Sequence, residues 1–180
     1  MKKIIITSMM VLFGVMGAMA QNDSSSFYEK SLGERFFMDI KMKAASKDNS
    51  TNMVGVGAEL GFEITPRLFA TANYEGVWNM KEAGGARTWW QTNNIGGGLG
   101  YKFYLAKNDK SLLQSAALKA SLLTSIGGVD WKQTVYEVGA ELEGKGKYKP
   151  VIGFGYRHTN SRTTGLPDHN GFYMSIGLRF

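Results

Sequence analysis

The sequence contains no cysteine, only three prolines and only two histidines among its 180 residues. The absence of cysteine excludes a disulfide framework, a thiolate metal site and a cysteine nucleophile. Because His158 and His169 are the only histidines, a histidine-rich metal site is not expected either. We therefore predict no metal and no cofactor.

An excess of charge of one sign is also nearly absent. The 21 Lys and Arg residues outnumber the 15 Asp and Glu residues by six, and Lys2 and Lys3 lie in a leader that we expect to be removed. The remaining excess of four positive charges is too small to favour nucleic acid as a partner. Hydrophobic residues make up 43% of the chain, which excludes a disordered protein, and glycine is abundant at 23 residues.

Residues 1–20 have the pattern of a secretory signal peptide. Lys2 and Lys3 precede an apolar stretch over residues 4–15, and Ala18-Met19-Ala20 forms a small-residue cleavage site. The apolar stretch is short for a membrane-spanning helix, which needs about 20 residues. We predict a cleaved signal peptide over residues 1–20 and an exported protein.

After residue 33 the dominant pattern is alternation of apolar and polar residues, which is typical of β-strands. The alternation recurs in eight stretches of about ten residues, the length that a tilted strand needs to cross a bilayer. Pro66, Pro150 and Pro167 all fall between these stretches. The predicted strands cover residues 35–43, 53–64, 68–78, 92–104, 116–126, 134–143, 151–159 and 171–180.

Alternation alone fits both a soluble barrel with its apolar face inward and a membrane barrel with that face outward. Many glycines share the charged face, where small residues leave room for long side chains in a crowded lumen. With Lys43, Glu63 and Glu143 included, this face carries seven bases and seven acids, and buried charges must be paired. A solvated face of mixed charge is the alternative. We predict a lumen network of ion pairs from Arg35, Asp39, Lys41, Glu59, Glu75, Lys102, Lys119, Glu137, Glu141, Arg157 and Arg179.

Aromatic residues of the apolar face gather at the strand ends, where a membrane barrel meets lipid headgroups. Trp78 and Trp89 lie at one end of their predicted strands. The opposite ends carry Phe36, Phe62, Tyr101, Phe103 and Phe180.

On these residues the chain resembles the small eight-stranded outer-membrane β-barrels of the OmpX and OmpA transmembrane-domain type, over about residues 34–180. The most specific element is the last strand, which is similar to the signal that the outer-membrane insertion machinery recognises: Phe172, Met174, Ile176, Leu178 and Phe180. The resemblance implies an all-β, antiparallel, up-and-down transmembrane barrel in the outer membrane of a Gram-negative bacterium. It also implies a periplasmic segment over residues 21–33, and outer-membrane lipid and the insertion machinery as partners. Outer loops are then expected near residues 44–51, 79–88, 127–133 and 160–170, with a tight hairpin at Gly127-Gly128.

His158 is a candidate for chemistry because it falls on the predicted lipid-facing side. With Ser161 it is loosely similar to the lipid A deacylases, which carry a His, a nearby Ser and a Glu on the outer wall. The order of residues differs here, and no acid lies on the lipid face to orient His158, so we expect an interfacial His and no catalytic site. The leading hypothesis is therefore a non-enzymatic barrel that acts through its surface loops or in envelope integrity. A narrow pore and an outer-wall lipid-modifying enzyme are the alternatives, and the sequence indicates no surface ligand.

Overall fold

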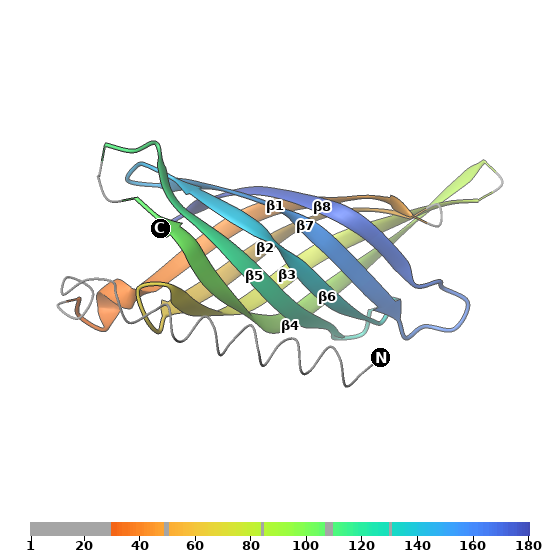
Figure 1. Cartoon of the computed structure of the whole chain (residues 1–180). Coiled ribbons are helices and arrows are strands. Elements are labelled where there is room, and N and C mark those ends of the chain that lie inside the picture. Colours follow the sequence, from red (N-terminus) through yellow and green to blue (C-terminus); the bar gives the residue numbers. More distant parts are fainter. Residues whose placement is uncertain (1–29, 49–50, 84, 107–109, 130) are drawn as a thin grey trace, which may run out of the picture.

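Eight antiparallel strands close into a single barrel (Figure 1). The computed structural model describes residues 30–48, 51–83, 85–106, 110–129 and 131–180, so the predicted signal peptide lies outside the described residues. The prediction of an all-β, eight-stranded antiparallel barrel is confirmed. The strands are β1 (Phe36–Asp48), β2 (Thr51–Glu63), β3 (Leu68–Ala83), β4 (Ala86–Leu105), β5 (Leu113–Ile126), β6 (Gln133–Gly144), β7 (Lys149–Ser161) and β8 (His169–Arg179).

The first and last strands form the seam that closes the barrel. β1 pairs with β8 from Asp39 opposite Arg179 to Ala45 opposite Tyr173. Beyond the last strand residue, the backbone N–H of Phe180 donates to the Met38 carbonyl at 2.8 Å, and the Met38 N–H donates to the Phe180 carbonyl at 3.2 Å. The closed sheet therefore has no free edge along the barrel wall.

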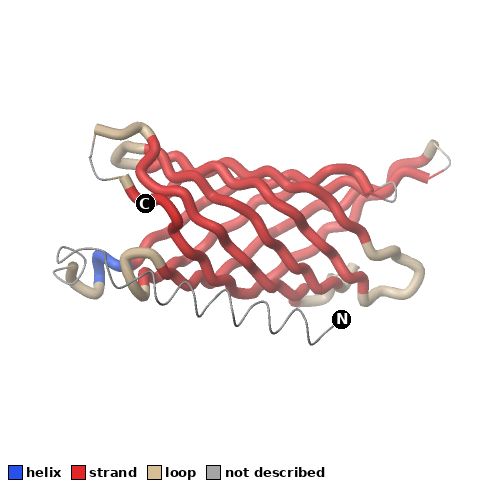
Figure 2. Tube along the Cα trace, viewed as in Figure 1, coloured by secondary structure: helices blue, strands red, loops and turns tan. Residues whose placement is uncertain are grey.

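The two ends of the barrel differ in their connections (Figures 1 and 2). The base end holds Phe180, the short 3₁₀ helix η2 (Gly33–Arg35) and the connections 64–67, 106–112 and 145–148. The Ser31 N–H donates to the Glu34 carboxylate at 2.7 Å, which lowers the pKa of Glu34. The opposite end, the loop end, holds the described residues of the remaining connections, 85, 127–129, 131–132 and 162–168. Among the described residues, no helix has the length and apolar character needed to cross a membrane.

The alternating side chains separate into a charged inner face and an apolar outer face. In the described part of the chain, 20 buried residues are polar or charged and only 12 are apolar. By contrast, 32 large apolar residues are exposed, among them Leu122, Ile176 and Phe172. A soluble domain buries the opposite set, since Lys, Glu, Arg and Asp are almost never fully buried unless they are paired.

The strands extend further than the alternation predicts, above all in the β3–β4 hairpin. The predicted outer loop at residues 79–88 is wrong, because β3 and β4 pair from Leu68 opposite Tyr101 to Ala83 opposite Ala86. Cross-strand contacts sustain this hairpin after the alternation ends: Met80 lies opposite Trp89, and Glu82 opposite Arg87.

Smaller corrections concern single residues. Arg35 lies in η2 rather than in the first strand, and Pro150 is the second residue of β7, at a strand start where proline is tolerated. The connection from Ile126 to Gln133 has six residues, so the expected tight hairpin is wrong, although Gly127 does take a left-handed φ of 79°. Tyr101 was expected on the exposed aromatic girdle, but only 8% of it is exposed, on a wall position flanked by other apolar side chains.

Candidate functional site

The barrel interior holds a first cluster of charges toward the loop end, centred on Arg157. The Arg157 side chain is only 2% exposed. Its guanidinium lies 2.7 Å from the Glu75 carboxylate and 2.6 Å from the Glu137 carboxylate. The Lys43 ammonium contacts the same two carboxylates at 3.2 and 2.8 Å. The Asn94 amide donates to Glu75 at 2.9 Å. Two cations and two anions thus form a neutral, hydrogen-bonded cluster, which is the condition for burying charge.

A second cluster lies nearer the base end, around Lys41 and Arg179. The Arg179 guanidinium contacts Asp39 at 2.7 Å, Glu141 at 2.6 Å and Glu143 at 2.7 Å. Lys119 pairs with Glu59. These partners come from β1, β2, β5, β6 and β8, so the cluster cross-links strands that are far apart in the sequence.

Three carboxylates of this second cluster have the spacing of a metal site. Oxygen atoms of Asp39, Glu59 and Glu141 all lie within 4.8 Å of one another. The Lys41 ammonium lies among them, 2.9 Å from Asp39 and 3.4 Å from Glu59, and it also pairs with Glu141. Lys41, together with Lys119 on Glu59 and Arg179 on Asp39 and Glu141, therefore supplies the three positive charges that the three acids require.

Against the second cluster, the lumen holds an apolar layer that the alternation did not reveal. The rings of Phe37 and Phe69 meet at 5.7 Å between centroids, and the Arg179 guanidinium stacks 4.0 Å from the Phe37 centroid. Gly61 and Gly100 make room for these rings, because a Cβ at either position would collide with Phe37 or Phe69. The glycines of the inner face thus accommodate aromatic rings as well as charged side chains.

Trp131 occupies the loop end of the lumen. It lies in the β5–β6 connection yet is fully buried, with its ring 5.7 Å from Trp90 and 5.4 Å from the ring of His169. Its indole N–H donates to the Ser161 hydroxyl at 3.1 Å, and its carbonyl accepts from the Thr92 hydroxyl at 3.1 Å. Trp131 therefore packs against residues of β4, β7 and β8 at this end.

The lumen also holds small cavities between the two clusters. Two of them, of about 40 and 30 Å³, are both bordered by Lys43, Lys119 and Glu137. Cavities of this size hold a few water molecules and no larger solute. Near Trp131, the carboxamides of Asn79 and Gln133 are fully buried and form no hydrogen bond within the described part of the chain.

Most of the residues predicted for the lumen network lie in these two clusters. Lys102 is separate, since it pairs with Glu63 nearer the base end, where Lys30 contacts the same carboxylate at 3.0 Å. Arg35 is half-buried and borders a hollow of about 140 Å³ at the base end. Tyr173, whose ring lies 5.2 Å from the Lys43 ammonium, joins the first cluster although its residue type gave no signal for this.

The predicted insertion-signal residues of the last strand all lie on the outer wall. They are exposed by 44 to 74%, and their neighbours at the base end include Tyr148, whose ring is 5.2 Å from that of Phe180. The residues concerned are Phe172, Met174, Ile176, Leu178 and Phe180.

The structure separates the two candidate catalytic residues. His158 lies on the outer wall, where its Nδ1 atom forms a hydrogen bond with the Asn170 side chain. Ser161 faces inward, and its hydroxyl accepts from Trp131 and donates to the Thr163 carbonyl at 3.3 Å. Asp168 accepts the Ser161 backbone N–H at 2.7 Å. A nucleophile and its base must lie within hydrogen-bonding reach, and opposite faces of one strand do not provide this.

Comparison with known proteins adds no family to this geometry. No protein-family model matches the chain, and no curated protein matches it.

Proposed function

We propose that the chain is an integral β-barrel of a bacterial outer membrane, with a closed, charge-paired lumen and a non-enzymatic role. In this proposal residues 1–20 are a cleaved export signal, and the last strand is the segment that the insertion machinery recognises. The protein acts through its loop-end surface or through the integrity of the envelope. Outer-membrane lipid is its immediate partner.

The observation that carries this proposal is the inverted distribution of side chains. The 32 large exposed apolar residues, most of them on the outer wall, are unfavourable in water, by roughly 25 cal/mol for each Å² of apolar surface, and favourable against acyl chains. A closed sheet also satisfies its backbone hydrogen bonds internally, as a bilayer requires. The ion-paired lumen needs no bulk water to balance its charges.

Arginine scanning on neighbouring residues of β5 tests which face meets lipid. Leu122→Arg places a charge on the outer wall, where we expect a loss of about 2–4 kcal/mol in the free energy of unfolding. Ile176→Arg and Ala140→Arg should behave in the same way. Ser121→Arg combined with Lys43→Met is the matched control, because Ser121 faces inward directly opposite Glu137, and the new cation replaces the one removed from that acid.

The measurement is a urea titration of the protein after it has refolded into phosphatidylcholine vesicles, with protection from added protease as the sign of insertion. A chain that stays outside the vesicles contradicts the proposed function. Equal losses for Leu122→Arg and for the Ser121→Arg, Lys43→Met double variant contradict the assignment of the faces.

The non-enzymatic part of the proposal makes a separate prediction. Because His158 and Ser161 lie on opposite faces of β7, His158→Ala and Ser161→Ala should leave the acyl chains of lipid A unchanged in cells that carry the protein. Mass spectrometry of lipid A from cells with and without the protein measures this directly. Loss of an acyl chain that depends on both residues would show an esterase and overturn the prediction.

A further inference from the structure

Positive charge is concentrated at the base end of the barrel. In the described part of the chain, the segment 30–35 and the three base-end connections contain six Lys and Arg residues and one acid. The described residues of the loop-end connections contain two bases and one acid. The net charge of the barrel is therefore distributed unevenly along its axis.

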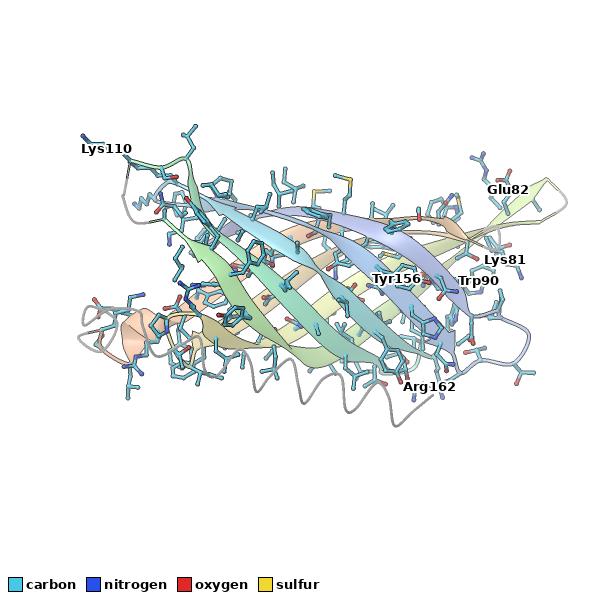
Figure 3. The ribbon with its side chains drawn as sticks, in the orientation of Figure 1. Lys81, Glu82, Trp90, Lys110, Tyr156 and Arg162 are labelled. Carbon is cyan, nitrogen blue, oxygen red and sulfur yellow. The ribbon has the colours of Figure 1, made fainter. Side chains whose placement is uncertain are left out.

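The described cations of the β4–β5 and β6–β7 connections form one rim. The Lys145 N–H donates to the Leu112 carbonyl at 3.0 Å, which joins the two connections. Lys110 of the first connection is exposed (Figure 3), and so are Lys145 and Lys147 of the second. We call Lys110, Lys145 and Lys147 the basic rim.

Two of these cations are not neutralised by the protein. Lys30 and Lys149, which also lie at the base end, contact Glu63 and Glu143. Lys145 and Lys147 form no ion pair with any acid in the described part of the chain. Their ammonium groups are thus available to an external anion.

Apolar and aromatic side chains lie at the same level as the rim. The Lys147 ammonium is 5.4 Å from the ring centroid of Tyr148, which packs against Phe180 on the outer wall. Leu112 is 86% exposed between Lys110 and the start of β5. Exposed cations beside aromatic rings and an exposed leucine are typical of the boundary between headgroups and acyl chains.

We propose that the basic rim binds the anionic phosphate headgroups of phospholipids in the leaflet that surrounds the base end. The inference rests on the proposed membrane location and adds a lipid preference to it. An anionic lipid fits better than an acidic protein, because Leu112 and Tyr148 lie where acyl chains would contact them. Each Lys near an anionic membrane surface strengthens binding by about five-fold at low salt.

The test compares vesicles of phosphatidylcholine with vesicles that also contain phosphatidylglycerol. We expect phosphatidylglycerol to raise the urea midpoint of the wild-type barrel at low salt, and 1 M NaCl to abolish this rise because the Debye length falls to about 3 Å. Phosphatidylglycerol lowers the unfolding equilibrium constant of the wild-type barrel by some factor. In the double variant Lys145→Gln, Lys147→Gln this factor should be about 25-fold smaller. The control is Lys81→Gln with Lys132→Gln at the loop end, which should keep the full effect.

The outcomes separate this inference from the proposed function. Failure to insert into phosphatidylcholine vesicles contradicts the membrane location itself. Insertion into both vesicles with no dependence on phosphatidylglycerol contradicts the inference alone. An equal loss in the base-end and loop-end double variants also overturns it, because the effect would then depend on total charge and not on the basic rim.

Discussion

Arg157→Met is expected to lower the free energy of unfolding by about 3–5 kcal/mol, since it removes one partner from a buried ionic cluster. Glu75 and Glu137 would then share Lys43 as their only cation in the cluster, and one negative charge would be left uncompensated inside the barrel. Methionine keeps much of the volume of the arginine stem, so the loss reports on charge more than on packing. Urea titration monitored by tryptophan fluorescence measures it.

Two further variants separate a charge effect from a general loss of fold. Glu75→Gln combined with Arg157→Met leaves Lys43 and Glu137, an electrically balanced pair at 2.8 Å, so the double variant should be more stable than Arg157→Met alone. Arg87→Met is the surface control, because its guanidinium is 65% exposed and 3.9 Å from Glu82, and such pairs contribute about 0–1 kcal/mol. If Arg87→Met costs as much as Arg157→Met, or if the double variant is the least stable, the cluster does not act as described.

The barrel itself could be predicted from the sequence because one physical rule governs every strand. Side chains alternate between two faces, so a residue such as Ile176 and its neighbour Ser175 are assigned to opposite sides by position alone. The same rule placed Arg157 and Glu137 inside. Which inner residues pair depends on the stagger between strands, and alternation contains no information on that stagger.

The features that sequence reasoning missed all break the alternation. Phe37 and Phe69 are apolar residues on the polar face, and only the facing glycines, Gly61 and Gly100, hint at them. The β3–β4 hairpin continues through polar residues, since strand pairing there depends on the partner strand and not on an apolar face. Trp131 follows the end of a predicted strand, so nothing in the local pattern indicates that its ring enters the barrel.

The second large effect is expected from Trp131, which lies within the predicted outer loop at residues 127–133. Trp131→Ala removes a fully buried ring that contacts Trp90 and His169, and a loss of about 3–5 kcal/mol is typical of such a truncation. Trp89→Ala is the matched control. Trp89 belongs to the same hairpin as Trp90 but is 58% exposed, so its removal should cost clearly less. Both are measured by the same urea titration.

We also expect the buried Trp131 ring to close the lumen to solutes, which can be tested by chemical access because the chain has no native cysteine. A single Gln133→Cys thiol should react slowly with a water-soluble maleimide in the wild-type background and at least about ten-fold faster with Trp131→Ala, since the polar layer around Asn79 and Gln133 would then meet solvent. Ser115→Cys, buried toward the base end beside Glu143, should stay protected in both backgrounds and so report that the barrel remains folded. Equal labelling of Gln133→Cys with and without the ring would show that Trp131 does not close the lumen.

The Arg157 and Arg179 clusters still block the path through the lumen when the Trp131 ring is removed. Planar-bilayer recordings should therefore show no stable discrete openings. Such openings in the wild-type protein would favour the narrow pore over the closed barrel.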